Sequence, residues 1–209
     1  MARLMRRYSS ILLLAAAVVL GEPSEAKRGL LQKGTVAETR YCLQPSGAVV
    51  IQVRLLISVK NDTQTPIILT RAATISSYTL RRTETAHPKT APLLSFAFPK
   101  QEAFDASGLD IARPPANLFE IVEPGASVER IVLAYLPFGR LQVAMSRPSE
   151  SYWLTVRLQH WMSSEGAAAS LQRAWSHFGL LWIDFAGVAP IKLIIERSPN
   201  VERCVGRVD

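Results

Sequence analysis

The stretch AVVIQVRLLISVKNDTQTPIILT, residues 48–70, sets the fold class of this chain. Apolar residues fall on every second position across Val49–Val59, with mostly polar residues between them. This period of two, built largely from β-branched side chains, predicts a β-strand with one buried face. Asn61–Thr63 predicts a turn, and Pro66 leads into a second strand over Ile67–Leu69. We expect the two strands to form a hairpin-like unit.

Similar strand patterns recur at short spacing along the rest of the chain. The segments expected to form or contribute strands are Thr74–Arg82, Leu93–Phe98, Leu118–Val122, Ser127–Leu136, Tyr152–His160, Leu180–Phe185 and Ile191–Glu196. Ala167–Trp175 is rich in helix formers and follows two serines that could cap it, Ser163 and Ser164. It predicts one short helix, with a mobile loop as the alternative.

The segment Glu84–Pro115 differs from its surroundings because five prolines interrupt it. It predicts a long, partly ordered surface loop. Short strands separated by turn residues, with little helix, are typical of an all-β fold. The sequence therefore predicts an antiparallel β-sandwich with one short helix and a long proline-rich loop.

Two stretches, QVRLLISVKNDTQTPIIL (Gln52–Leu69) and FEIVEPGASVERIVL (Phe119–Leu133), resemble immunoglobulin-like domains of exported bacterial proteins. In those domains one strand ends in an Asn-containing turn and a later strand follows a Pro-Gly turn. The resemblance implies an immunoglobulin-like sandwich and brings no active site with it. The chain departs from antibody-type domains, because its cysteines lie too far apart for the usual inter-sheet bridge.

The N-terminal stretch has the three zones of a secretory signal peptide. Arginines at its start precede an apolar run of ten residues, Ile11–Leu20, and Ser24-Glu25-Ala26 supplies small residues for cleavage before Lys27. The run is shorter than the about 20 residues that a bilayer crossing needs. We expect a signal peptide at residues 1–26 and one domain at residues 27–209; an uncleaved anchor, or cleavage after Gly21, is the alternative.

Two cysteines, Cys42 and Cys204, lie near opposite ends of the expected mature chain. In an exported protein an even count favours a disulfide. Such a bridge would tie the first strand region to the last, and two free thiols are the alternative. Neither cysteine has a CxxC partner that would suggest redox catalysis.

The chain is basic, with 24 Lys and Arg against 17 Asp and Glu, hence a formal net charge of +7. Nucleic-acid binding is one interpretation of such a charge. The basic residues form no block, however, and an exported protein meets little nucleic acid, so we expect a dispersed polar surface and no nucleic-acid partner. No later apolar run is long enough to predict a transmembrane segment in the mature chain.

Histidines are the first candidates for chemistry, but His87, His160 and His177 do not stand at ligand spacing. A distributed metal site from His160, His177 and Asp184 is conceivable, as is a triad of Ser163 with His177 and Asp184. No spacing marks either set, and GxSxG and phosphate-binding glycine motifs are missing. We predict no enzymatic activity, cofactor or metal.

All four tryptophans lie in the last third of the chain. Trp153 and Trp161 share the strand phase opposite to Leu154, Val156 and Leu158. If that phase faces outward, the two rings form a possible binding surface for sugars or for a protein partner. The alternative, which the average burial of large aromatics favours, is that both rings are covered.

Three functions follow, in order of preference. The first is an exported, non-enzymatic binding or structural domain that recognises an envelope or secreted protein, in the periplasm or outside the cell, with Glu84–Pro115 as the contact surface. The second is a glycan-binding module that uses Trp153 and Trp161. The third is a hydrolase whose site no motif marks.

Overall fold

The computed structural model describes residues 29–44, 46–85, 91–100, 104–137, 151–195 and 201–204, so the expected signal peptide lies outside it. The described part is mostly β-strand with one α-helix, α2 (Glu165–Ala174), and a short 3₁₀ helix, η1 (Ala106–Gly108). Its strands are β1 (Leu30–Leu43), β2 (Val49–Asn61), β3 (Ile67–Thr70), β4 (Thr74–Arg81), β5 (Leu94–Ala97), β6 (Phe119–Val122), β7 (Ser127–Pro137), β8 (Ser151–Gln159), β9 (Leu180–Leu181), β10 (Phe185–Gly187), β11 (Ile191–Ile194) and β12 (Glu202–Arg203).

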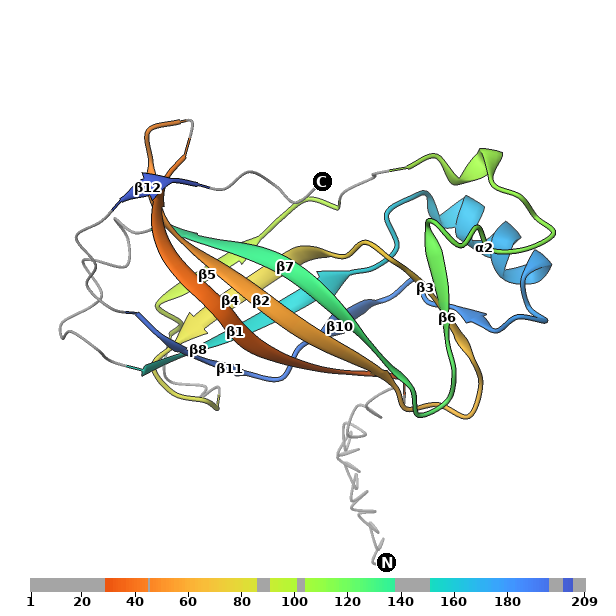
Figure 1. Ribbon diagram of the computed structural model, residues 1–209, viewed down its shortest axis with the longest axis horizontal. Coiled ribbons are helices and arrows are strands. Elements are labelled where there is room, and N and C mark those ends of the chain that lie inside the picture. The colour runs from red at the N-terminus through yellow and green to blue at the C-terminus, as the bar shows by residue number, and fades with distance from the viewer. Residues whose placement is uncertain are drawn as a thin grey trace, which may run out of the picture.

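The strands form two stacked sheets and a smaller third one. The first sheet has the order β12-β1-β2-β7, the second has β10-β8-β4-β5 with β11 also on β8, and the third has β6-β3-β9. All pairs are antiparallel except β1 with β12 and β3 with β9. In Figure 1 the first sheet lies over the second with its strands crossing those behind, and β3, β6 and α2 lie together at one end.

This architecture confirms the predicted all-β sandwich with a short helix. The immunoglobulin-like assignment stays a prediction. The helix begins as expected, because the Ser164 hydroxyl accepts a hydrogen bond from the Ala167 amide at 3.3 Å.

The core follows from the alternation in β2. The odd-numbered side chains from Ile51 to Val59 are fully buried between the two large sheets. They pack in one cluster with the alternate side chains of β8, among them Leu154, Val156 and Leu158. One face of β2 thus lies in the core. Its two edges pair with β1 and β7.

The expected hairpin between β2 and β3 is wrong. β3 pairs with β6 and β9, not with β2. The reason lies in Asn61, whose buried side-chain amide donates to Thr65 O and Val122 O, each at 2.8 Å. These bonds fold the turn away from the first sheet and lead the chain into the third.

One expected strand is divided between two sheets, and the proline-rich segment, in which the strand expected at Leu93–Phe98 is found as β5, is packed more closely than expected. The segment Leu180–Phe185 splits into β9, which joins the third sheet, and the start of β10, which joins the second. The proline-rich segment is built into the fold where it is described: β5 pairs with β4, and Phe104 and Leu109 pack on a second apolar core.

β1 is a strand that the sequence patterns did not single out. Its alternation is broken by a β-bulge between Val36 and Glu38 and by Gly34 in an inward position. A Cβ at Gly34 would come 2.5 Å from Ile191 Cδ1 and 2.8 Å from Ile57 Cδ1. The glycine therefore lets β1 approach the second sheet closely.

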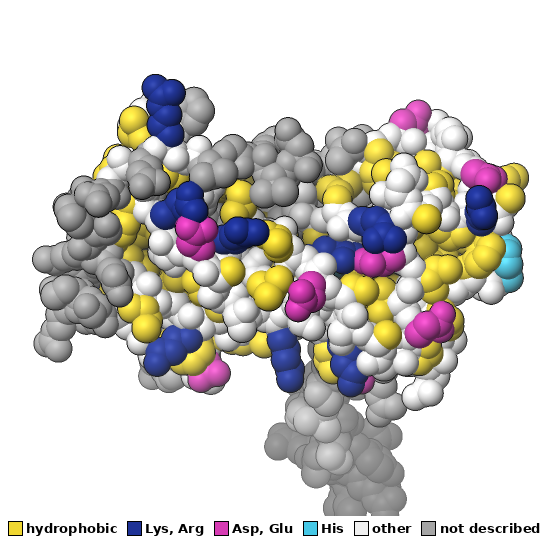
Figure 2. Space-filling view, in the orientation of Figure 1, with side chains coloured by type: hydrophobic (Ala, Val, Ile, Leu, Met, Phe, Trp, Pro, Cys, Tyr) yellow, Lys and Arg dark blue, Asp and Glu magenta, His cyan; other side chains and the backbone are white. Residues whose placement is uncertain are grey.

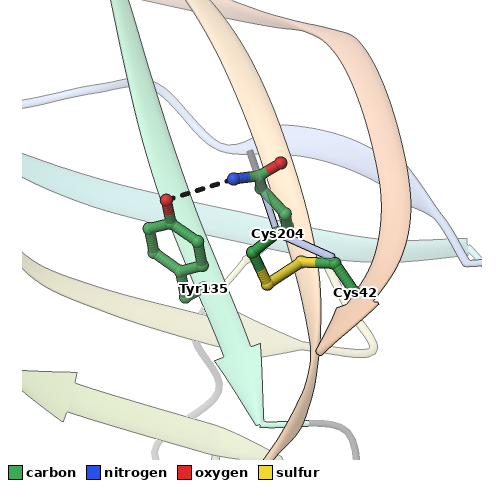
Figure 3. Close-up of a disulfide and its surroundings, with 4 residues drawn as sticks. Cys42, Tyr135 and Cys204 are labelled. Atoms are coloured by element: carbon green, nitrogen blue, oxygen red, sulfur yellow. Dashed lines mark hydrogen bonds between the residues drawn. A yellow bond between two sulfur atoms is a disulfide. The ribbon is translucent and has the colours of Figure 1, made fainter. Parts of the chain in front are cut away.

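The disulfide between Cys42 and Cys204 is present, as predicted. Cys42 lies one residue before the end of β1 and is fully buried, and Cys204 follows β12, which lies parallel to β1. Figure 3 shows the bridge beside Tyr135, whose hydroxyl accepts a hydrogen bond from Gln52 Nε2 at 3.1 Å. The bridge joins residues 162 positions apart and attaches the end of the chain to the first sheet.

The loop that this bridge closes predicts its effect on stability. Replacing both cysteines with serine should lower the free energy of unfolding by about 2–5 kcal/mol, because an unfolded chain without a cross-link gains conformational entropy. Urea unfolding of the double variant measures this. The wild type in reductant is the control and should unfold at nearly the same urea concentration. Equal midpoints for oxidised wild type and double variant would contradict the prediction.

Gly34 gives a second prediction. Gly34→Ala should lower the free energy of unfolding by about 1–2 kcal/mol, because the new methyl group overlaps two buried isoleucines. Ile191→Val in the Gly34→Ala background should recover part of this loss, since it removes the nearest atom. Gly187→Ala is the matched control, because no atom lies within 4 Å of its added Cβ. Equal free energies of unfolding for the two alanine variants would contradict the prediction that β1 approaches the second sheet closely at Gly34.

Candidate functional site

The structure separates the two tryptophans of the possible binding surface. β8 ends at Gln159, so Trp161 no longer follows the strand's alternation. Its side chain is 1% exposed and packs against Phe104 in the second core, while its Nε1 donates to Ser164 O at 3.1 Å. Trp153 stays in β8 and is half-buried. Trp161 is therefore covered, as the favoured alternative had it, and the two rings do not form one presented pair.

The candidate catalytic residues do not come together either. Ser163 is buried and accepts a hydrogen bond from the Ala106 amide at 3.2 Å. His177 is exposed, with its ring 4.0 Å from that of Phe178, and makes no hydrogen bond to described residues. His87 lies outside the described residues. Across the described ranges, no three His, Cys, Asp or Glu side chains are grouped in a way that could hold a metal ion.

His160 is instead part of a buried polar cluster that joins the three sheets. Its Nε2 accepts a hydrogen bond from Gln32 Nε2 of β1 at 2.7 Å, and its carbonyl accepts one from the Thr70 hydroxyl of β3. Arg130 of β7 donates to Thr70 O at 2.9 Å and pairs with Glu120 of β6. We name Gln32, Thr70, Glu120, Arg130 and His160 the inter-sheet cluster.

The sequence held a signal for this cluster. Arg130 occupies the same strand phase as Val128 and Val132, so the inward face of β7 carries a charge among apolar residues. A charge in that phase requires a partner inside the protein.

The electrostatics of the cluster keep His160 neutral. Burial, and secondarily the nearby positive charge of Arg130, lower the pKa of His160 to about 4. A histidine that is fully buried and neutral at physiological pH cannot exchange protons readily with a substrate in solution. The cluster therefore links the three sheets through polar contacts.

A groove of about 240 Å³ opens between β7 and the start of β4. Its lining is Ala73, Thr74, Ile75, Tyr78, Phe98, Ile131, Val132, Leu133, Ala134 and Tyr135. Ile131 is 47% exposed and Phe98 is 39% exposed. We name this feature the β7 groove. Figure 2 shows hydrophobic side chains interspersed with Lys and Arg over the face that carries β1, β2 and β7.

Aromatic packing gives the β7 groove a fixed wall. The ring centroid of Tyr78 lies 5.6 Å from that of Phe96 and 5.8 Å from that of Phe98. The Tyr78 hydroxyl donates to Tyr135 O at 2.7 Å, which ties β4 to β7. Burial raises the pKa of Tyr78 to about 12, so the phenol keeps the proton that it donates.

The β7 groove was not predicted from the sequence, although β7 carries a signal for it. Both phases of β7 are apolar after Arg130: Val132 and Ala134 face the core, while Ile131 and Leu133 occupy the other face. One face of a strand at a sandwich surface is normally polar, so a strand that is apolar on both faces indicates a second contact.

A second groove, of about 570 Å³, lies between α2 and the segment Leu180–Asp184. Its lining includes the small side chains of Ala168 and Ala169. Main-chain amides of its lining residues already donate hydrogen bonds within the protein. The Leu181 amide donates to Gln172 Oε1 at 2.6 Å, and the Trp182 amide donates to Ile68 O at 3.0 Å. This groove can hold apolar side chains but offers fewer main-chain groups to a ligand.

No family model, curated protein or solved structure matches this chain. In the part of the chain that is described, no helix has both the length and the apolar character needed to cross a bilayer.

The shifted pKa of His160 predicts a pH-dependent stability. The pKa of His160 falls from its ordinary value of 6.5 to about 4 on folding, so the unfolded state binds the proton more tightly. Stability is therefore full above pH 6.5 and falls as the pH drops toward 4, by about 3 kcal/mol in total. The difference between the pH profiles of the wild type and His160→Gln, measured by urea unfolding, isolates this contribution.

His177→Gln is the matched control, because His177 is exposed and makes no hydrogen bond to described residues. Its profile should follow that of the wild type. Parallel profiles for the wild type and His160→Gln would contradict the assignment of the pH dependence to His160.

Proposed function

We propose that this chain is an exported, non-enzymatic binding domain that recognises another envelope or secreted protein through the β7 groove. The observation that carries the proposal is the exposed apolar pair of Ile131 and Phe98 beside a fixed aromatic wall. Exposed apolar patches of this kind on a folded domain are typical of interaction sites.

Two observations support export to the periplasm or beyond. The first is the pattern of a signal peptide at residues 1–26. The second is the Cys42–Cys204 disulfide, because disulfides persist in oxidising compartments and are rare in the cytosol.

The β7 groove also refines the expected contact surface. Phe98 belongs to the proline-rich segment Glu84–Pro115, which the sequence suggested as the contact region. Other parts of that segment are packed inside: Ala106 is buried and Phe104 lies against Trp161. The proposed contact therefore uses the Phe98 end of the segment together with β7.

The two other candidate functions have less support. Sugar stacking on Trp153 and Trp161 requires two presented rings, and Trp161 is buried. A hydrolase requires a histidine that meets a carboxylate or serine in an open pocket, whereas His160 is buried and neutral and the His177 ring lies tilted against that of Phe178.

Affinity capture tests the proposed function. The chain from Lys27 onward, immobilised with its disulfide intact, is exposed to a detergent extract of the native envelope, and bound proteins are identified by mass. Ile131→Asp should reduce recovery of a specific partner at least tenfold, because it places a charge in an apolar contact. Leu31→Asp is the matched control: Leu31 is 48% exposed on β1, away from the groove, and the variant should capture as well as the wild type.

Thermal unfolding of each variant confirms that it is folded before capture. Equal recovery by Ile131→Asp and Leu31→Asp would exclude the β7 groove as the contact. A folded wild type that retains no specific protein would exclude the proposed function and return glycan binding to the test.

A further inference from the structure

Among the described residues, the main chain of β7 has a neighbouring strand on one edge only. Within the described ranges β7 pairs only with β2. The Asn61 amide of β2 donates to Ala126 O at 3.0 Å, and antiparallel pairing then repeats every second residue. Even-numbered residues of β7 therefore bond to β2, and the amides and carbonyls of odd-numbered residues point away from it.

Two side-chain bonds agree with this orientation. Arg130 Nη1 donates to Glu129 O at 2.9 Å, and the Tyr78 hydroxyl donates to Tyr135 O at 2.7 Å. Both carbonyls belong to odd-numbered residues, and neither bond involves β2. Between them, the outward amides and carbonyls of Ile131 and Leu133 have no hydrogen-bond partner among the described residues. We name this stretch of edge, from Glu129 to Tyr135, the β7 window.

The β7 window and the β7 groove coincide. Ile131 and Leu133, which carry the open main-chain groups, also line the groove. A ligand there meets hydrogen-bonding groups at the spacing of a β-strand, with an apolar hollow beside them. An extended polypeptide satisfies both, because its main chain pairs with an edge while alternate side chains enter pockets.

Charge favours an acidic segment. Arg54 lies opposite Leu133 in the register of β2 and β7, is exposed, and has no ion-pair partner among the described residues. At the other end of the window, Arg130 and Arg71 share the single carboxylate of Glu120. Even with Glu129 counted, the positive charges along the window exceed the negative ones, in keeping with the net charge of +7.

The opposite edge of the same sheet is less suited to this role. β1 is covered at one end by β12, and at the other the Gln32 carbonyl accepts a hydrogen bond from the Ala189 amide at 3.1 Å. The β-bulge between Val36 and Glu38 interrupts the edge between these points. Bulges and short covering strands are common devices that block pairing with another chain.

We propose that the partner binds by β-strand addition: an extended segment with apolar residues at alternate positions and acidic residues at its ends pairs with the β7 window. This inference rests on the proposed function, since it names the mode in which the β7 groove holds a protein. The paired segment would receive hydrogen bonds from the Ile131 and Leu133 amides and place an apolar side chain beside Phe98.

A synthetic peptide tests the mode without knowledge of the partner. The probe is the capped heptapeptide Asp-Val-Thr-Val-Thr-Val-Asp at millimolar concentration, added to the chain from Lys27 onward. Hydrogen exchange of the Ile131 and Leu133 amides, followed by NMR, should slow at least tenfold. The same peptide with N-methyl groups on alternate amides is the control and should have no effect, because it cannot complete the ladder. A version with Lys in place of Asp should protect less.

A proline variant tests the natural partner in the capture experiment. Leu133→Pro removes an amide that points away from β2, so the sheet should remain intact while strand addition is blocked. Leu133→Ala is its matched control, because it removes the same side chain and keeps the amide. The Leu133 side chain also lines the β7 groove, so both variants should lose some capture, and a much larger loss with Leu133→Pro than with Leu133→Ala supports the inference.

Other outcomes would overturn it. Capture that is unaffected by Leu133→Pro would leave the proposed function standing and reject strand addition. Ile131 and Leu133 amides that are already protected in the monomer would mean that the chain covers its own edge. Protection that grows with protein concentration, together with the mass of a dimer, would assign the edge to a second copy. No protection by the acidic peptide would reject the mode even if capture finds no partner.

Discussion

The burial of one face of β2 is the constraint on which the rest of the structure depends. Five alternate side chains, from Ile51 to Val59, lose all contact with water between the two large sheets. At about 2 kcal/mol for each such side chain, their burial contributes about 10 kcal/mol, which is comparable to the net stability of a whole domain. Because β2 pairs along both edges, it also fixes the positions of β1 and β7, and with them the position of the open edge.

The sequence predicts those parts of the fold that depend on local periodicity and capping. The alternation in β2 and β8, the cap at Ser164 and the disulfide are all found as expected. The errors arise where tertiary contacts override the local pattern. Asn61 looks like an ordinary turn residue, but its buried amide bonds to Val122 O and redirects the chain. Trp161 keeps the spacing of a strand, but β8 ends at Gln159. The spacing therefore does not predict which way the Trp161 side chain faces.

The candidate site was only partly accessible to sequence reasoning. The outward apolar residues Ile131 and Leu133 are visible in the pattern of β7, but the groove also needs Phe98 and Tyr78 from the second sheet. Long-range pairing decides which strands meet across the sandwich. The periodicity within a single segment does not predict this pairing. The same limit applies to the inter-sheet cluster, in which His160 and Gln32 come from distant strands.

The inter-sheet cluster and the β7 window are linked through Arg130. Its side chain is 8% exposed, and its guanidinium pairs with Glu120 while also donating to the carbonyls of Thr70 and Glu129. Burying a charge is costly unless hydrogen bonds and an opposite charge compensate it, so this set of contacts fixes β7 against the third sheet. At the other end, Tyr78 fixes the carbonyl of Tyr135. The contacts of Arg130 and Tyr78 hold β7 at both ends of the β7 window. The outward amides and carbonyls of Ile131 and Leu133 between them therefore stay aligned for pairing with an added strand. The contacts that stabilise this side of the sandwich are thus the same ones that preorganise its open edge.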